Sequence, residues 1–93
     1  MFAIAFDLTV EEVRTRHPKG VTQACNDIGN TLAGYGFDWR QGSVYVCDNE
    51  DLANLLSALN ALKALPWFPA SVRDIRAFRV EQLSDFTAFM KGN

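Results

Sequence analysis

The order in which hydrophobic periodicities follow one another along this chain constrains its fold more than any other feature of the sequence. The first eight residues, MFAIAFDL, alternate large apolar side chains with alanines and Asp7, which is the period-two pattern of a strand. After a charged connector, TVEEVRTRHPKG, apolar side chains recur at helical spacing from Val21 to Tyr35. Two short β-type runs, residues 37–40 and 43–47, then flank a Gln41–Gly42 turn and predict a hairpin.

The second half of the chain adds one more helix and one more strand. Leucines recur at helical spacing from Leu52 to Leu62, and Pro66 ends this helix. Residues 71–80, SVRDIRAFRV, then read as a last strand. The order strand, helix, strand, strand, helix, strand predicts the ferredoxin-like fold of the α+β class, a βαββαβ unit in which two helices cover one face of a four-stranded antiparallel sheet.

A chain of 93 residues has room for one hydrophobic core, so residues 1–93 are predicted to form a single domain. The last stretch, residues 81–93, carries Leu83, Phe86 and Phe89 and is too apolar to stay in solvent. We expect this C-terminal tail to pack on the sheet edge or on a dimer partner. An aromatic content of 12% in so short a chain also favours a homodimer, because a small domain cannot hide that much apolar surface.

Charge and cysteine content exclude several classes of protein. A net charge of −2 argues against a protein that coats nucleic acid through clustered lysines and arginines. Cys25 and Cys47 are too few for a disulfide scaffold and are predicted to be reduced, buried thiols. The N-terminal run has no basic leader and is interrupted by Asp7, so we expect neither a signal peptide nor a membrane span, and a cytoplasmic location.

Histidine and tryptophan side chains often serve in active sites or in nucleic-acid binding, but His17 and Trp67 of this chain are predicted to have structural roles. His17, the only histidine, stands in the loop-like stretch RTRHPKG and is predicted to lie at the surface. A single histidine also cannot supply an acid–base pair of two imidazoles. Trp67 and Phe68 lie between two prolines and are predicted to anchor a turn to the core.

Strand alternation predicts which side chains share a face with Asp7. The first strand is central in this topology and runs antiparallel to the third and fourth strands. The helix-covered face is then predicted to hold Ile4, Phe6, Val44, Val46, Ile75 and Ala77. The opposite, helix-free face is predicted to hold Asp7, Ser43, Tyr45, Asp74 and Arg76. Alternation points Arg73 and Arg79 away from this polar group, whereas Arg40 extends a basic strip near it.

The helix-free face also carries apolar side chains and needs a cover, which a second subunit would provide. These side chains are predicted to be Ala3, Ala5, Val72, Phe78 and Val80. A two-fold axis through this face would bring two copies of Asp7 together. Magnesium is held by one or two carboxylates together with substrate phosphates, so paired Asp7 side chains could bind it, and no organic cofactor is expected.

Four stretches of the sequence resemble the virulence-associated protein D family: MFAIAFDL, HPKGVTQA, QGSVYVCDNEDLANL and LPWFPASVRDIRAFRVEQLSDFT. The match covers nearly the whole chain, and SVRDIRAFRVE with SDFT is its most specific part. The resemblance implies a small bacterial endoribonuclease, in some hosts the toxin of a toxin–antitoxin module. It also implies a fold and dimer similar to those of the small nucleases of CRISPR adaptation.

The resemblance assigns roles to residues that alternation had already grouped. It implies that Asp7 in FDL is the catalytic aspartate and that Ser43 in QGSVYV and Asp74 in SVRDIRAF line the active site. Asp7 would then hold a magnesium ion or accept a proton from water or from the 2′-hydroxyl of RNA, and the sequence does not choose between these. Arg76 and Arg40 would bind RNA phosphates, and a small antitoxin protein is an expected partner.

Each of these residues also has a structural alternative. Asp7 could be a solvated strand-end carboxylate, and Ser43 could bond the backbone of its turn. Asp74 and Arg76 could form an ion pair that only orders a dimer interface. The competing function is a non-catalytic ferredoxin-like dimer that binds RNA or a protein.

Overall fold

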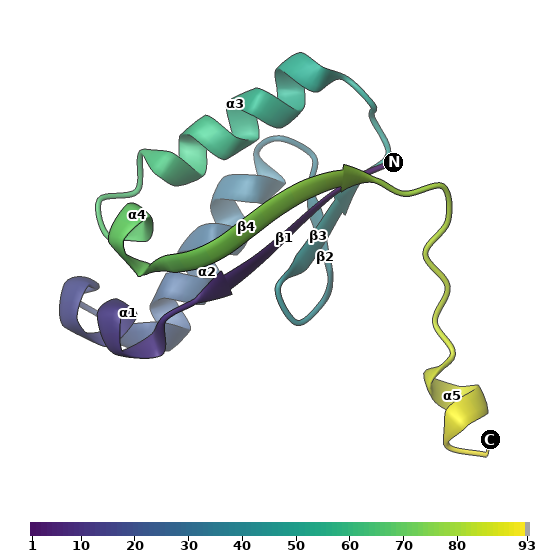
Figure 1. The fold of residues 1–93 in the computed structure, drawn as a ribbon, viewed down its shortest axis with the longest axis horizontal. Helices are drawn as coiled ribbons and strands as arrows, with labels where there is room; N and C mark the ends of the chain where they lie inside the picture. The colour runs from purple at the N-terminus through teal and green to yellow at the C-terminus, as the bar shows by residue number, and fades with distance from the viewer. Residues whose placement is uncertain (93) are drawn as a thin grey trace.

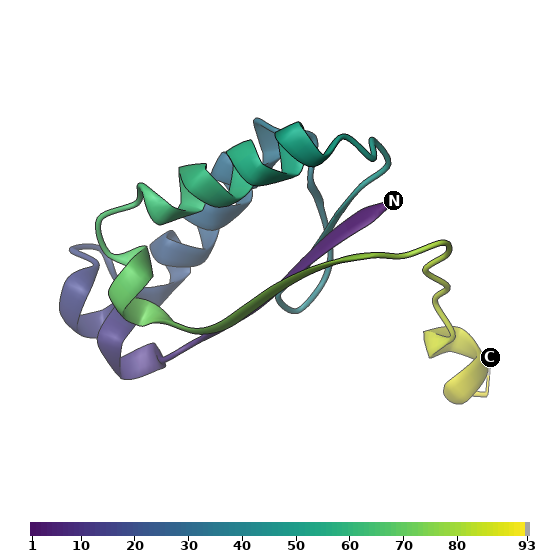
Figure 2. The ribbon, with the colours of Figure 1, turned by 45° about the horizontal axis from the view of Figure 1, so that its top comes forward.

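The computed structural model describes residues 1–92 and contains one four-stranded sheet. Its strands are β1 (Phe2–Leu8), β2 (Asp38–Gln41), β3 (Val44–Cys47) and β4 (Val72–Arg79). They are arranged in the order β2-β3-β1-β4, and each neighbouring pair is antiparallel. The two long helices, α2 (Gly20–Ala33) and α3 (Leu52–Lys63), lie together on one face of the sheet (Figures 1 and 2). The predicted ferredoxin-like fold is therefore confirmed.

The core lies between these helices and the sheet. Ile4 from β1, Ile28 from α2 and Leu62 from α3 are all fully or almost fully buried in it. The helix α3 begins at a cap, because the Asp51 carboxylate accepts a hydrogen bond of 2.9 Å from the Ala53 N–H. Each of the two long helices buries one stripe of apolar side chains, which explains why the spacing of these residues in the sequence predicted both helices.

The charged connector after the first strand contains a helix that was not predicted, α1 (Val10–Arg16). Two ion pairs, each between side chains about one helical turn apart, support this helix: Arg14–Glu11 at 3.0 Å and Arg16–Glu12 at 2.9 Å. Val13 provides the anchor, since it is the one buried residue of α1 and has no exposed surface. A single buried valine is too weak a periodic signal to reveal a helix of this length.

The turn before the last strand is anchored to the core by its aromatic side chains, as predicted. Trp67 and Phe68 are buried at the start of the short helix α4 (Phe68–Ser71), and the Ser71 hydroxyl donates to the Trp67 carbonyl at 2.7 Å. Both cysteines are free thiols, as predicted, and Cys47 is buried. The predicted burial of Cys25 is wrong, because this residue lies on the exposed side of α2. No helix within residues 1–92 is both long enough and apolar enough to cross a membrane.

The C-terminal tail leaves the sheet after β4 and ends in one helical turn, α5 (Thr87–Met90). Figures 1 and 2 show it extending away from the sheet and the helices. Its large apolar side chains, Leu83, Phe86, Phe89 and Met90, are exposed in the single chain. Packing of this tail on the sheet edge or on a dimer partner stays a prediction.

The prediction for the faces of β3 is wrong by one residue. Ile4 pairs with Tyr45, so Tyr45 shares the helix-covered face, whereas Val44 and Val46 belong to the helix-free face with Ala5 and Ala3. The Tyr45 ring stacks on Phe6 with a centroid distance of 6.0 Å, and burial raises the pKa of Tyr45. Burying this ring removes more apolar surface from water than burying a valine would, which favours the observed register.

Candidate active site

Asp7 lies near the end of the central strand β1, directly opposite Asp74 of β4. Its side chain is 51% exposed, and that of Asp74 is 52% exposed. Two carboxylates facing each other across a strand pair repel unless cations compensate them. The juxtaposition of Asp7 and Asp74 on the helix-free face was predicted, and the structure confirms it.

The cation at Asp7 is an arginine that the sequence analysis placed on the wrong face. Arg73 Nε donates to Asp7 Oδ2 at 3.0 Å, and Arg73 Nη2 contacts the same oxygen. The hydrogen bond and charge of Asp7 raise the pKa of Arg73. Strand alternation fails here because the pairing of β1 with β4 shifts between Asp7 and Leu8, so that Leu8 lies opposite Val72 and Arg73 has no partner in the ladder.

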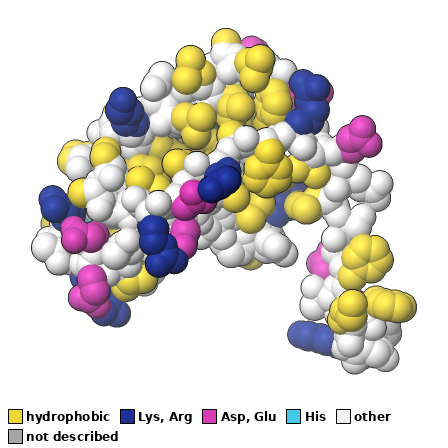
Figure 3. Space-filling view, in the orientation of Figure 1, with side chains coloured by type: hydrophobic (Ala, Val, Ile, Leu, Met, Phe, Trp, Pro, Cys, Tyr) yellow, Lys and Arg dark blue, Asp and Glu magenta, His cyan; other side chains and the backbone are white. Residues whose placement is uncertain are grey.

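The cation at Asp74 is Arg76, two residues along β4. Arg76 Nε lies 3.3 and 3.2 Å from the two carboxylate oxygens of Asp74. This ion pair was one of the predicted interpretations of the two residues. In Figure 3, basic and acidic side chains alternate over β1 and β4 beside a hydrophobic patch. The two aspartates and two arginines, Asp7, Arg73, Asp74 and Arg76, are called the charge cluster below.

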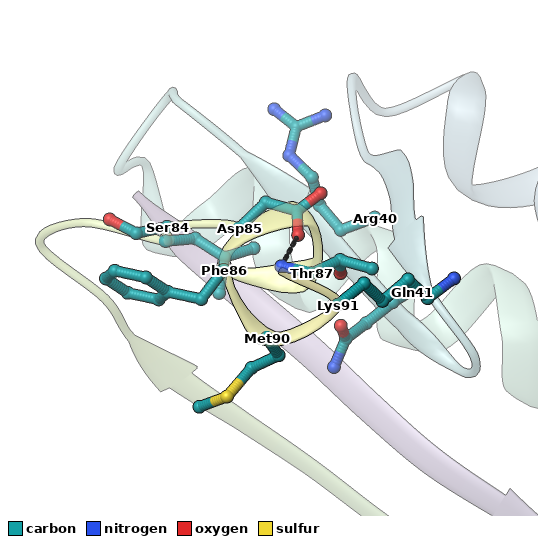
Figure 4. Close-up of a pocket in the computed structure, with 9 residues that line it drawn as sticks. Arg40, Gln41, Ser84, Asp85, Phe86, Thr87, Met90 and Lys91 are labelled. Atoms are coloured by element: carbon teal, nitrogen blue, oxygen red, sulfur yellow. Dashed lines mark hydrogen bonds between the residues drawn. The ribbon is translucent and has the colours of Figure 1, made fainter. Parts of the chain in front are cut away.

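Ser43 and Arg40 do not join this cluster by their side chains. Ser43 is a turn residue whose carbonyl accepts from the Phe6 N–H at 3.2 Å, which places its backbone one residue from Asp7. Arg40 belongs to β2, at the edge of the sheet opposite β4. There it lines an open hollow of about 550 Å³ together with tail residues that include Asp85 and Lys91 (Figure 4).

The carboxylates of one chain do not make a complete metal site. Within residues 1–92, no three His, Cys, Asp or Glu side chains are grouped so that they could hold a metal ion. Asp7 and Asp74 are each compensated by an arginine, which lowers their attraction for a divalent cation. The predicted magnesium site therefore depends on a second Asp7 from a dimer partner, and it stays a prediction.

His17 is buried, which corrects its predicted surface position. Its Nε2 lies 2.7 Å from Asp27 Oδ2, and its Nδ1 accepts a 3.0 Å hydrogen bond from the Lys19 N–H. The ring packs edge-on against Trp67 with a centroid distance of 5.1 Å. Because Nδ1 accepts a hydrogen bond, Nε2 carries the ring proton and donates a hydrogen bond to the Asp27 carboxylate. The hydrogen bond from His17 lowers the pKa of Asp27.

These contacts assign His17 a structural role. It joins the end of α1 to α2 and to the turn before α4, and only 6% of it is exposed. Both of its ring nitrogens are engaged by the chain itself. An arrangement of this kind leaves no free imidazole nitrogen to exchange a proton with a substrate.

Comparisons with known proteins place the chain in a family. No family model matches the sequence. The endoribonuclease VapD homolog of Neisseria gonorrhoeae is 64% identical over 91 residues, which cover 98% of this chain and 99% of that protein. Endoribonuclease VapD of Haemophilus influenzae is 59% identical with the same coverage, and that of Dichelobacter nodosus is 47% identical over 99% of both chains. The chain therefore belongs to the VapD endoribonuclease family, the virulence-associated protein D family that its sequence resembles.

Proposed function

We propose that this chain is an endoribonuclease of toxin type and that Asp7 is the centre of its active site. The relatives are named as endoribonucleases, which supports RNA as the substrate class. The observation that carries the assignment of the site is the exposed charge cluster, in which the two aspartates lie opposite each other and each is paired with an arginine. Cleavage of a phosphodiester bond can use exposed carboxylate and guanidinium groups that lie side by side. The carboxylate accepts a proton, and the guanidinium attracts the phosphate.

The proposed reaction uses the hydroxyl group that distinguishes RNA from DNA. Asp7 accepts the proton of a 2′-hydroxyl, whose oxygen then bonds to the adjacent phosphorus. The bond between phosphorus and the 5′-oxygen breaks, and that oxygen takes a proton from a water molecule. The hydroxide that remains takes the proton from Asp7, which restores the carboxylate. No histidine is free to act as the acid, since His17 is buried and paired with Asp27. We therefore expect slow cleavage.

The proposed active unit is a homodimer formed through the helix-free face. Phe78 on this face is 46% exposed, and it lies opposite Ala3 in the sheet. A two-fold axis here duplicates every residue of the face and brings two charge clusters into one cleft. Magnesium between the two copies of Asp7 and a small antitoxin protein as a partner complete this proposal.

Cleavage of a defined single-stranded RNA tests the assignment of Asp7. Wild type and Asp7→Asn should be purified in parallel and assayed with magnesium, with EDTA, and on the same oligonucleotide carrying 2′-deoxy sugars. We expect wild type alone to cleave the RNA, and neither protein to cleave the deoxy substrate. Asparagine keeps the size of the side chain and removes its ability to accept a proton.

Other outcomes would assign other functions. Equal cleavage by wild type and Asp7→Asn would place the active site elsewhere or reveal a contaminating nuclease. Binding of the RNA by both proteins without cleavage would favour the competing binding module. Loss of wild-type cleavage in EDTA, with recovery in magnesium, would support the magnesium site at paired Asp7 side chains.

A further inference from the structure

A β-bulge delivers Arg73 to Asp7. Asp7 lies opposite Asp74 and Leu8 lies opposite Val72, so two residues of β1 are spanned by three residues of β4. Arg73 is the extra residue, and its side chain reaches the face that regular alternation denies it. Bulges of this kind re-aim a side chain, and they are over-represented next to active sites.

The geometry of the pair leaves one carboxylate oxygen of Asp7 without a contact to Arg73. Both Arg73 donors, Nε and Nη2, address Oδ2 of Asp7. Two donors from one planar guanidinium restrict rotation of the carboxylate more than a single contact would. Oδ1 of Asp7 is therefore the oxygen held in a defined direction to accept a proton.

The pair lies where stability alone does not explain it. The Asp7 and Arg73 side chains are 51% and 68% exposed, and exposed ion pairs contribute little to folding. Arg73 also lies next to Asp74 in the chain, and the charge of Asp74 contributes to the raised pKa of Arg73. Arg73 thus compensates the repulsion between the two facing carboxylates as well as orienting one of them.

We propose that Arg73 is a positioning residue for RNA cleavage, which holds the Asp7 carboxylate in the direction that the reaction requires. This proposal rests on the proposed function, and it adds a residue that strand alternation points away from the site. Arg73 acts through Asp7, so its removal should slow the chemical step more than it weakens RNA binding. Arg79 is the matched control, because it lies on the same strand and is also an exposed arginine paired with a carboxylate, that of Glu50 at 3.3 Å.

The test compares steady-state cleavage by wild type, Arg73→Ala, Arg73→Lys and Arg79→Ala. We expect Arg73→Ala to lower kcat about 100-fold with a change in KM of less than about threefold, since a misplaced reacting group costs rate and not affinity. Arg73→Lys keeps the charge but not the planar pair of donors, and kcat should recover to within about 10-fold of wild type. Arg79→Ala should cleave at the wild-type rate, and all four proteins should melt within about 3 °C of each other.

Two results would overturn the proposal while leaving the proposed function intact. A wild-type kcat in Arg73→Ala would show that the ion pair is only a surface contact. A raised KM with unchanged kcat would show that Arg73 binds RNA and does not position Asp7. By contrast, an inactive wild type or an active Asp7→Asn variant removes the proposed function, and this proposal with it.

Discussion

At the scale of single residues, burial separates the charged groups that serve the fold from those that are free to meet a substrate. Asp7 is half-exposed beside an exposed arginine, whereas His17 is buried and satisfied by two internal hydrogen bonds. A buried polar group that has lost its partner costs the full desolvation of that group. The two residues should therefore respond to substitution in opposite ways, Asp7 through activity and His17 through stability.

Substitution of His17 should destabilise the protein without impairing its site. We expect His17→Ala to lower the free energy of unfolding by about 2 kcal/mol, because it removes a buried ring and leaves the Lys19 N–H and the Oδ2 atom of Asp27 without their hydrogen-bond partner. Urea denaturation at neutral pH measures this loss. His17→Gln, which keeps a donor and an acceptor, serves as the control. A fall in RNA cleavage by folded His17→Ala, with stability unchanged, would contradict the structural role.

The pKa of Asp27 adds a dependence on pH to this contact. A carboxyl group whose pKa is lowered in the folded protein stabilises the fold above its unfolded pKa, which is near 3.8. That contribution is present at neutral pH and is lost as the pH falls through the folded pKa of Asp27. The hydrogen bond from His17 is the first cause of the lowered pKa, so the contact between the two should weaken in acid.

At the scale of elements, α1 connects β1, the strand that carries Asp7, to the rest of the fold. It follows β1 after Thr9, whose N–H donates to the Ser71 carbonyl at 2.8 Å, just before β4 begins. The ends of both strands that carry the charge cluster are thus tied together at one point. A helix of seven residues has little intrinsic stability, so its order depends on Val13 and on its neighbours.

Truncation of Val13 tests this dependence. We expect Val13→Ala to cost about 1–2 kcal/mol of unfolding free energy, because it removes two fully buried methyl groups and leaves a small cavity. The rate of amide hydrogen exchange should rise more in α1 than in α2 or α3. Exposed Glu12→Ala on the same helix is the control, and it should change stability by less than about 0.5 kcal/mol. Uniform exchange in all three helices would show that α1 is not a separate unit.

At the scale of the whole molecule, two of the apolar surfaces that one chain leaves exposed bear on the proposed dimer. One is the helix-free face of the sheet around Phe78, and the other is the C-terminal tail. Large apolar side chains grouped on a surface favour association. The helix-free face includes the strands that carry the charge cluster, and the tail follows one of them, β4, in the chain. A dimer through the helix-free face would therefore build the active site and hide apolar surface at the same time.

A charge at Phe78 should dissociate this dimer. We expect wild type to have the mass of a dimer in light scattering, and Phe78→Arg to have the mass of a monomer, because an arginine facing its own copy across the two-fold axis is repelled. Leu52→Arg is the control, since Leu52 is 68% exposed at the start of α3 and lies off the sheet. A monomeric wild type, or a dimeric Phe78→Arg, would exclude this interface.

The sequence by itself determined the order of the four strands and the two long helices, and the side of the sheet on which Asp7, Asp74 and Arg76 lie. These features depend on local periodicity, because each helix or strand buries one face of its own. The two prolines that flank Trp67 and Phe68 also indicated the turn that these buried side chains anchor to the core.

Only the tertiary structure decided which face of β3 is buried, which arginine meets Asp7, and that His17 lies inside. A shift of one residue in strand pairing moves every side chain of a strand to the opposite face of the sheet. A β-bulge does the same for its one unpaired residue. Tyr45 and Arg73 were misplaced for these two reasons. His17 was misplaced because its partners, Asp27 and Trp67, are distant in the chain, and a contact between distant segments has no local pattern.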